Sequence, residues 1–95
     1  MSGRVEGNIA SISDDGNLVT DISVEKLADA PRGEETVISC DTHQTMGLFA
    51  LDHGQPEMTL LAILGESGFL ELAIVGDSAK IMLGVGVGEA VTVKW

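Results

Sequence analysis

The sequence predicts a small all-β protein, an antiparallel sandwich or barrel of about seven short strands with two short helices. Two observations support this fold class. Two apolar runs of strand length, Leu60 to Leu64 and Phe69 to Ile74, flank a polar turn bracketed by glycines, which is typical of a β-hairpin. The other apolar stretches are also short, and the turns between them are rich in aspartate, glycine and asparagine, as in Asp14 to Asn17.

Length and composition indicate a single globular domain over residues 1–95. Of the 95 residues, 44% are hydrophobic, enough for one core without a metal or a disulfide. The single cysteine, Cys40, has no intramolecular partner, which favours a reducing compartment. The first residues form no apolar signal sequence, and the longest uninterrupted apolar run, Leu60 to Leu64, is far shorter than the ~20 residues of a membrane helix. A cytoplasmic location without membrane association is therefore expected.

The charge of the chain argues against nucleic acid as a partner. Fifteen acidic and five basic residues give a formal net charge of −10 at pH 7. The basic residues are scattered along the sequence: Arg4, Lys26, Arg32, Lys80 and Lys94. Because phosphate backbones and anionic membranes repel such a surface, neither is an expected partner. We interpret the acidity as a solubility feature.

The first two strands are predicted on either side of the Asp14 to Asn17 turn. Val5 to Ser13 alternates apolar and polar residues, and its apolar face changes near Ile9. This change indicates a β-bulge or a strand that is covered on both faces. Leu18 to Ile22 is the predicted return strand.

A short helix and two extended segments are predicted before the central hairpin. Ser23 is placed to cap a helix over Val24 to Ala28, whose apolar residues share one face. Thr36 to Cys40 and Gln44 to Leu51 are predicted strands. Asp52 to Glu57 contains glycine and proline and is a predicted loop.

The central hairpin and the C-terminal segment complete the predicted fold. Leu60 to Leu64 is apolar at consecutive positions, so we expect both faces of this strand to be buried. After the hairpin, Asp77 or Ser78 is placed to cap a second short helix that ends at Gly84. A last strand is predicted from Ala90 to Lys94. The expected buried stripe of the second helix is Ala79, Met82 and Leu83.

The sequence contains no catalytic or metal-binding motif. Cys40, His43 and His53 do not match the ligand spacing of a zinc site. The glycines from Gly84 to Gly88 follow a predicted helix, whereas the dinucleotide-binding fingerprint opens one. Ser67 lies in G-E-S-G, which lacks the G-x-S-x-G form of a nucleophile elbow. We therefore expect no catalytic residue and no metal ligand in this chain.

Three segments resemble one family in their order and spacing. Asp14 to Ile22, with the sequence D-D-G-N-L-V-T-D-I, resembles the R-F-G-N-L-I-T-N-I segment of the S-adenosylmethionine hydroxide adenosyltransferases and their fluorinase and chlorinase relatives. Leu64 to Ala73 resembles their N-S-S-G-Y-L-E-I-A hairpin. Gly76 to Val91 resembles the helix and strand that close the domain. The resemblance covers nearly the whole chain, but only the C-terminal domain of that family.

The resemblance implies a fold and an assembly. It implies a small antiparallel β-barrel, which favours the barrel over the sandwich. In that family the active site lies between the C-terminal domain of one subunit and the N-terminal domain of its neighbour in a trimer, so a homo-oligomer is implied. The N-terminal domain carries the residues that position water or halide for attack. Because this chain resembles only the other domain, we expect no complete catalytic site in it.

The resemblance also implies a set of ligand-binding residues. Asn17 matches the asparagine that contacts adenine, and its amide offers both a donor and an acceptor. Gly76 and its neighbours match the backbone that meets the adenine. Glu66 and Ser67 match the turn that holds the methionine carboxylate, although a glutamate there repels a carboxylate. Ser13 stands where the family has an acidic residue for the methionine amino group.

Three hypotheses about function follow. The first is a non-catalytic, oligomerising module with a weak site for adenosine or S-adenosylmethionine and no required cofactor. The second is a structural interaction domain that has lost the ligand. The third is one half of a split S-adenosylmethionine hydroxide adenosyltransferase, whose N-terminal domain is a separate partner chain.

Overall fold

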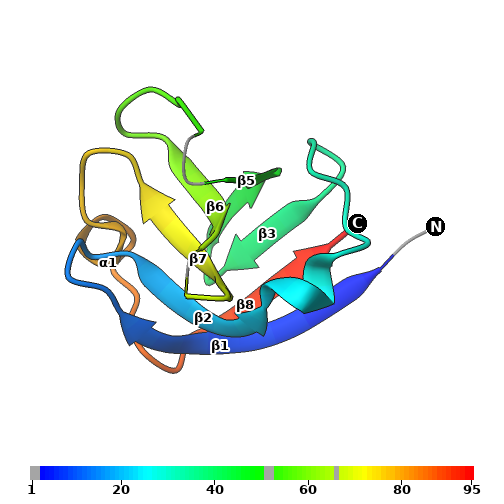
Figure 1. The fold of residues 1–95 in the computed structure, drawn as a ribbon. Helices are drawn as coiled ribbons and strands as arrows, with labels where there is room; N and C mark the ends of the chain where they lie inside the picture. Colours follow the sequence, from blue (N-terminus) through cyan, green and yellow to red (C-terminus); the bar gives the residue numbers. More distant parts are fainter. Residues whose placement is uncertain (1–2, 51–52, 66) are drawn as a thin grey trace.

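The protein folds as a nearly closed β-barrel in a computed structural model that describes residues 3–50, 53–65 and 67–95 (Figure 1). The described residues contain eight strands, which form one sheet in the order β4-β3-β8-β1-β2-β7-β6-β5. The strands are β1 (Arg4–Ile12), β2 (Leu18–Ser23), β3 (Val37–Cys40), β4 (His43–Met46), β5 (Leu48–Phe49), β6 (Leu60–Leu64), β7 (Phe69–Ile74) and β8 (Ala90–Lys94). A 3-10 turn, η1 (Val24–Leu27), and a short helix, α1 (Ala79–Leu83), lie between strands. The predicted all-β barrel with two short helical segments is confirmed.

The barrel closes where the chain bends between β4 and β5. β4 pairs antiparallel with β3, whereas β5 pairs parallel with β6, so one segment contributes to both ends of the sheet. The bend is at Gly47, whose φ of 87° favours glycine. Beside it, the Thr45 hydroxyl donates to the Leu60 carbonyl at 2.9 Å and ties β4 to β6. The extended segment predicted over Gln44 to Leu51 is therefore broken into two strands, and its last residue lies outside the described residues.

The central hairpin pairs as predicted. β6 and β7 are antiparallel neighbours in one continuous register. Ala62 on β6 belongs to the main core. Leu61 and Ile63 form a second apolar cluster with Ala73 of β7. Because side chains from successive positions enter the two clusters, both faces of Leu60 to Leu64 are buried, as the continuous apolar run predicted.

The main apolar core fills the interior of the barrel. Its members come from strands that are distant in the sequence but adjacent in the sheet, such as β1 and β8. The fully buried side chains include Ile9, Leu18, Ile38, Leu70, Val91 and Val93. Removing any of these strands would expose apolar surface, at a cost of about 25 cal/mol per Å².

β2 has an irregular register on both of its edges. Its pairing with β1 shifts between Ile9 and Ser11, which confirms a bulge near Ile9. Its pairing with β7 shifts between Val19 and Ser23. Each shift interrupts a ladder of backbone hydrogen bonds, so the backbone groups nearby need other partners.

Thr20 and Asp21 supply those partners. The Thr20 hydroxyl donates to the Leu70 carbonyl at 2.7 Å and accepts from the Ile22 amide at 3.1 Å. The Asp21 carboxylate accepts from the Asn8 amide at 2.8 Å. Thr20 therefore bonds toward β7 and Asp21 toward β1, and the two side chains hold β2 in place across its irregular stretch.

η1 begins after the predicted cap Ser23, and α1 begins after Ser78, one of the two caps that the sequence left open. Ser23 Oγ accepts from the Glu25 amide before η1, and Ser78 Oγ accepts from the Ile81 amide before α1. α1 ends at Gly84, which has a φ of 69°. These caps confirm the predicted start of each segment and the predicted end of the second.

The apolar stripe predicted for α1 is only partly correct. Ala79 is fully buried and Leu83 packs against the main core, but Met82 is 47% exposed. The three residues span little more than one turn and all lie within α1, but only Ala79 and Leu83 face the core. Within the described residues, no helix has the length and apolar character needed to cross a membrane.

Replacing Thr20 with valine tests its role in holding β2. Valine keeps the shape of the side chain but leaves the Leu70 carbonyl and the Ile22 amide without their buried partner. We expect the free energy of unfolding to fall by about 1–3 kcal/mol, measured by urea unfolding. Thr92→Val is the matched control, because Thr92 faces outward on β8 between two buried valines. An equal loss in both variants would show that the Thr20 hydroxyl has no special role.

Candidate functional site

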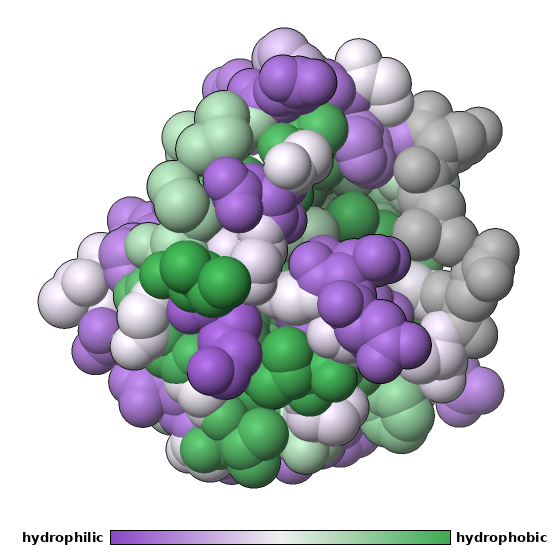
Figure 2. Space-filling model, turned by 90° about the vertical axis from the view of Figure 1, so that its left-hand side faces the viewer, coloured by the Kyte–Doolittle hydropathy of each residue, from purple (hydrophilic) through white to green (hydrophobic). Residues whose placement is uncertain are grey.

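A cleft lies between the β1–β2 turn and the connection from β7 to α1. It has a volume of about 480 Å³. Its walls are formed by Asp15, Asn17, Ile74, Gly76, Asp77 and Ser78. Figure 2 views the molecule from this end, the left-hand side of Figure 1, and shows hydrophilic and hydrophobic residues side by side. Its lining therefore combines polar groups with one apolar side chain, that of Ile74.

The β1–β2 turn is held against the start of α1. The Gly16 carbonyl accepts from the Lys80 amide at 3.0 Å. Gly16 has a φ of 86°, and a Cβ atom there would lie 2.9 Å from the Cα of Ser78, so this approach requires glycine. Within the turn, Ser13 Oγ accepts from the Asn17 amide at 3.1 Å. These contacts fix the position of Asn17 at the cleft.

The opposite wall is ordered by its own hydrogen bonds. Asp77 Oδ1 accepts from the Ser78 amide at 2.7 Å, and Ser78 Oγ caps α1. The Asp77 amide donates to the Ile74 carbonyl at 3.1 Å. Gly76 turns the chain between them with a φ of 78°. The wall is therefore formed before any ligand arrives.

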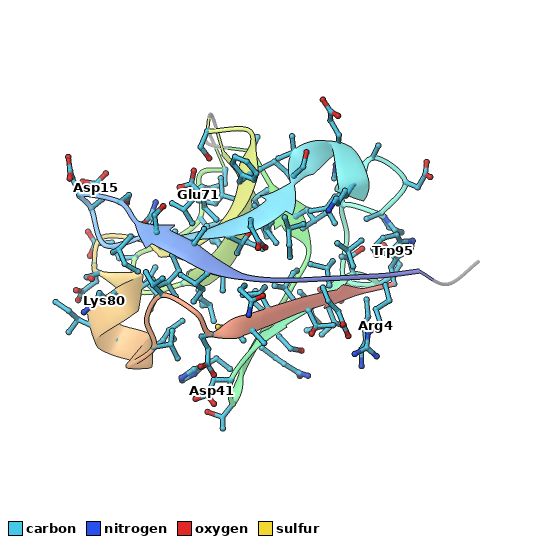
Figure 3. All side chains as sticks on the ribbon, turned by 90° about the horizontal axis from the view of Figure 1, so that it is seen from below. Arg4, Asp15, Asp41, Glu71, Lys80 and Trp95 are labelled. Carbon is cyan, nitrogen blue, oxygen red and sulfur yellow. The ribbon has the colours of Figure 1, made fainter. Side chains whose placement is uncertain are left out.

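Negative charge surrounds the cleft. Asp15 and Asp77 line it, and both are exposed. Glu57 lies beside Gly76, where a Cβ atom would be 3.6 Å from the Glu57 Cγ. Figure 3 shows Asp15 and Lys80 at the same end of the barrel. Asp14 lies in the same turn as Asp15, so Lys80 is outnumbered by carboxylates and this end of the molecule is acidic.

The structure brings together two of the four residues predicted to bind a ligand. Asn17 and Gly76 line the same cleft. Ser67 lies in the turn before β7, at the opposite end of that strand from Gly76. Its hydroxyl donates to Glu71 Oε2 at 3.0 Å, within its own hairpin. Glu66 lies outside the described residues.

Sequence reasoning misses Asp15 and Ile74 as cleft residues, and it identifies Asp77 and Ser78 only as candidate helix caps next to Gly76. Turn chemistry fully explains an aspartate at position 15, so the sequence gives no separate signal for its place in the cleft. Ile74 belongs to the core face of β7 and is 7% exposed. Its contact with the cleft depends on where β7 ends, which the sequence does not specify to the residue.

Cys40 is a buried thiol on β3. Its side chain belongs to the main core, and 3% of the residue is exposed. Burial, followed by the negative charges of Glu89 and Asp41, raises the pKa of the thiol from 9.0 to about 11. The thiolate is the reactive form of cysteine, so this environment suppresses nucleophilic chemistry at Cys40.

Both histidines make structural contacts. His43 Nε2 donates to the Leu83 carbonyl at 3.0 Å and joins β4 to the end of α1. His53 Nδ1 accepts from the Gln55 amide at 2.9 Å within its loop. In the part of the chain that the structure describes, no group of three or more histidine, cysteine, aspartate or glutamate side chains is arranged to hold a metal ion.

Comparisons with known proteins point to one family and one fold. The family model of the SAM hydroxide adenosyltransferase C-terminal domain matches residues 7–92. A crystal structure of an uncharacterized conserved protein from Thermotoga maritima has a TM-score of 0.79 and 22% identity, and the match covers 95% of this chain and 35% of that one. A crystal structure of a conserved hypothetical protein from Thermus thermophilus has a TM-score of 0.73 and 27% identity, over 93% of this chain and 34% of that one. This chain thus spans about a third of the length of either protein. No curated protein matches the sequence.

The raised pKa of Cys40 predicts a decline in stability at alkaline pH. From about pH 9 to 11 the unfolded chain loses the thiol proton while the folded chain keeps it, so the free energy of unfolding falls with rising pH. Below that range the thiol contributes no pH dependence. In urea unfolding, the free energy of unfolding of the native protein should therefore fall more steeply with rising pH than that of Cys40→Ala.

The same burial predicts slow alkylation of Cys40. Iodoacetamide at about pH 8 should modify the native protein much more slowly than the urea-unfolded chain, because little thiolate forms in the core. Equal rates in the two states, followed by mass spectrometry, would contradict the assignment of Cys40 as a buried neutral thiol.

Proposed function

The chain belongs to the family of SAM hydroxide adenosyltransferase C-terminal domains, and on this basis we propose that it is a binding module for an adenosine-type ligand. The proposal rests on one observation, that Asn17 and Gly76 line the same cleft. These residues are distant in the sequence, and the family resemblance assigns both to the adenine side of a ligand. Their position in one cleft is what binding of a single base requires.

The groups around the cleft suit a purine. The Asn17 side chain offers an N–H donor and a carbonyl acceptor, which match the edge of adenine. Ile74 supplies apolar surface, and Gly76 has no side chain to keep a ring away from the backbone. The described lining contains no aromatic side chain on which a base could stack. Binding is therefore proposed to be weak.

Adenosine is better supported than the methionine part of S-adenosylmethionine. Ser13, which stands at the position of the family's acidic residue, uses its hydroxyl to accept from the Asn17 amide. The Ser67 hydroxyl donates to Glu71 within its own hairpin, at the far end of β7 from Gly76. The proposal is therefore for adenosine, or for S-adenosylmethionine held mainly through its adenosine part.

A second proposal is self-association, because α1 and the loop after it expose apolar side chains. Ile81 is 75% exposed, Met82 47% and Val87 66%. Figure 2, which faces this end, shows hydrophobic residues on the surface. Contiguous apolar patches mark interaction surfaces, and we propose that these three side chains form one. A homo-oligomer, a trimer by analogy with the family, would cover them. Alternatively, a separate chain that carries the catalytic domain would cover this apolar surface.

Adenosine binding is tested by amide chemical shifts. Millimolar adenosine should shift the resonances of Asn17 and Gly76, and free methionine should not. Asn17→Ala should weaken binding about fivefold, since a hydrogen bond contributes about 1 kcal/mol. Asn8→Ala is the matched control, because the Asn8 side chain donates to the Gly88 carbonyl and lies outside the cleft. Cleft resonances that do not move at millimolar adenosine would contradict the proposal.

Self-association is tested by light scattering. We expect a mass above that of the monomer at about 0.1 mM protein, and a fall toward the monomer in Ile81→Glu, because the charge cannot be buried unpaired in an apolar interface. Met46→Glu is the control, since Met46 is similarly apolar and 53% exposed but lies on β4. A monomeric native protein, or equal effects of the two variants, would overturn the assignment of this surface.

A further inference from the structure

The amides at the start of α1 are already bonded to protein oxygens. Peptide N–H groups at such positions are often where a phosphate binds. Here the Ser78 amide donates to Asp77 Oδ1 at 2.7 Å. The Lys80 amide donates to the Gly16 carbonyl at 3.0 Å. The Ile81 amide donates to Ser78 Oγ at 3.3 Å. Three donors that a phosphate would use are therefore occupied.

Carboxylates face the cleft from both of its walls. Asp15 comes from the β1–β2 turn and Asp77 from the connection before α1. Glu57 lies beside Gly76 on a third segment. Lys80 is the one basic residue in the turn and in α1. A phosphate in this cleft would thus meet repulsion from two directions and no arginine among these groups, and the amides of Ser78, Lys80 and Ile81 are already bonded.

We infer that the cleft selects nucleosides by charge, with Asp15 and Asp77 as the specificity-determining residues. It accepts neutral or cationic nucleosides and disfavours those that carry a phosphate. The inference rests on the proposed function, because it concerns what the same cleft admits. The negative charges that repel a phosphate would attract a nucleoside with a positive sulfonium group.

The test compares adenosine with AMP, which share the base and the ribose. In about 20 mM salt, where screening is weak, adenosine should bind the native protein about tenfold more tightly than AMP. In the double variant Asp15→Asn, Asp77→Asn this ratio should fall to about threefold or less. Asparagine keeps an oxygen that can accept from the Ser78 amide, so the wall of the cleft is preserved. Raising the salt to about 0.5 M should also reduce the ratio in the native protein.

A second double variant separates local charge from net charge. Asp29→Asn, Asp41→Asn changes the net charge by the same amount at exposed positions outside the cleft, and Asp41, with a φ of 54°, occupies a conformation that asparagine tolerates. Figure 3 shows Asp41 well apart from Asp15. The tenfold ratio should persist in this control.

Three outcomes would overturn the inference. Equal binding of AMP and adenosine to the native protein shows that the cleft does not select by charge, although the proposed function stands. An equal loss of selectivity in the two double variants assigns the effect to net charge. If adenosine itself fails to bind, the proposed function fails and the selectivity fails with it.

Discussion

The position of β2 between β1 and β7 is the constraint on which the cleft depends. Both of its ladders are irregular, and Thr20 and Asp21 bond across the interruptions. β2 begins at Leu18, directly after Asn17, so a slip of this strand would move the turn away from α1. The segment that resembles the family therefore has two kinds of residue. Thr20 and Asp21 have a structural role, and Asn17 lies where a ligand can reach it.

Local chemistry explains why much of the fold could be predicted from the sequence. The turn between β6 and β7, the cap at Ser78 and the stop at Gly84 each depend on residues close in the chain. The bend at Gly47 could not be predicted in the same way, because a glycine within an extended segment also fits a continuous strand. The segment is divided because it pairs with β3 before the bend and with β6 after it. The exposure of Met82 could not be predicted either, since helical spacing indicates which residues share a face but not which of them the rest of the protein buries.

The cleft was less predictable than the fold because tertiary contacts join its walls. The family resemblance identifies Asn17 and Gly76, yet it gives no reason why Asp15 should lie with them. That reason is the close approach of Gly16 to Ser78, between segments far apart in the sequence. The net charge of −10 is evident from the sequence. Which of the acidic residues lie at the cleft is evident only from the fold, because the sequence does not show which segments come together.

The apolar surface of α1 and the cleft share one end of the barrel, so the proposed association and the proposed ligand binding would be coupled. Ile81 and Met82 lie within one turn of Ser78, a residue of the cleft. A partner seated on them would stand beside the cleft, exclude water from it and strengthen its hydrogen bonds and charge interactions. By linkage, a ligand would then stabilise the assembly by the same free energy by which the assembly tightens ligand binding. If the proposals hold, a single barrel would bind the ligand weakly and an assembly would bind it more strongly, and the difference between the two affinities would measure how much the partner contributes to the cleft.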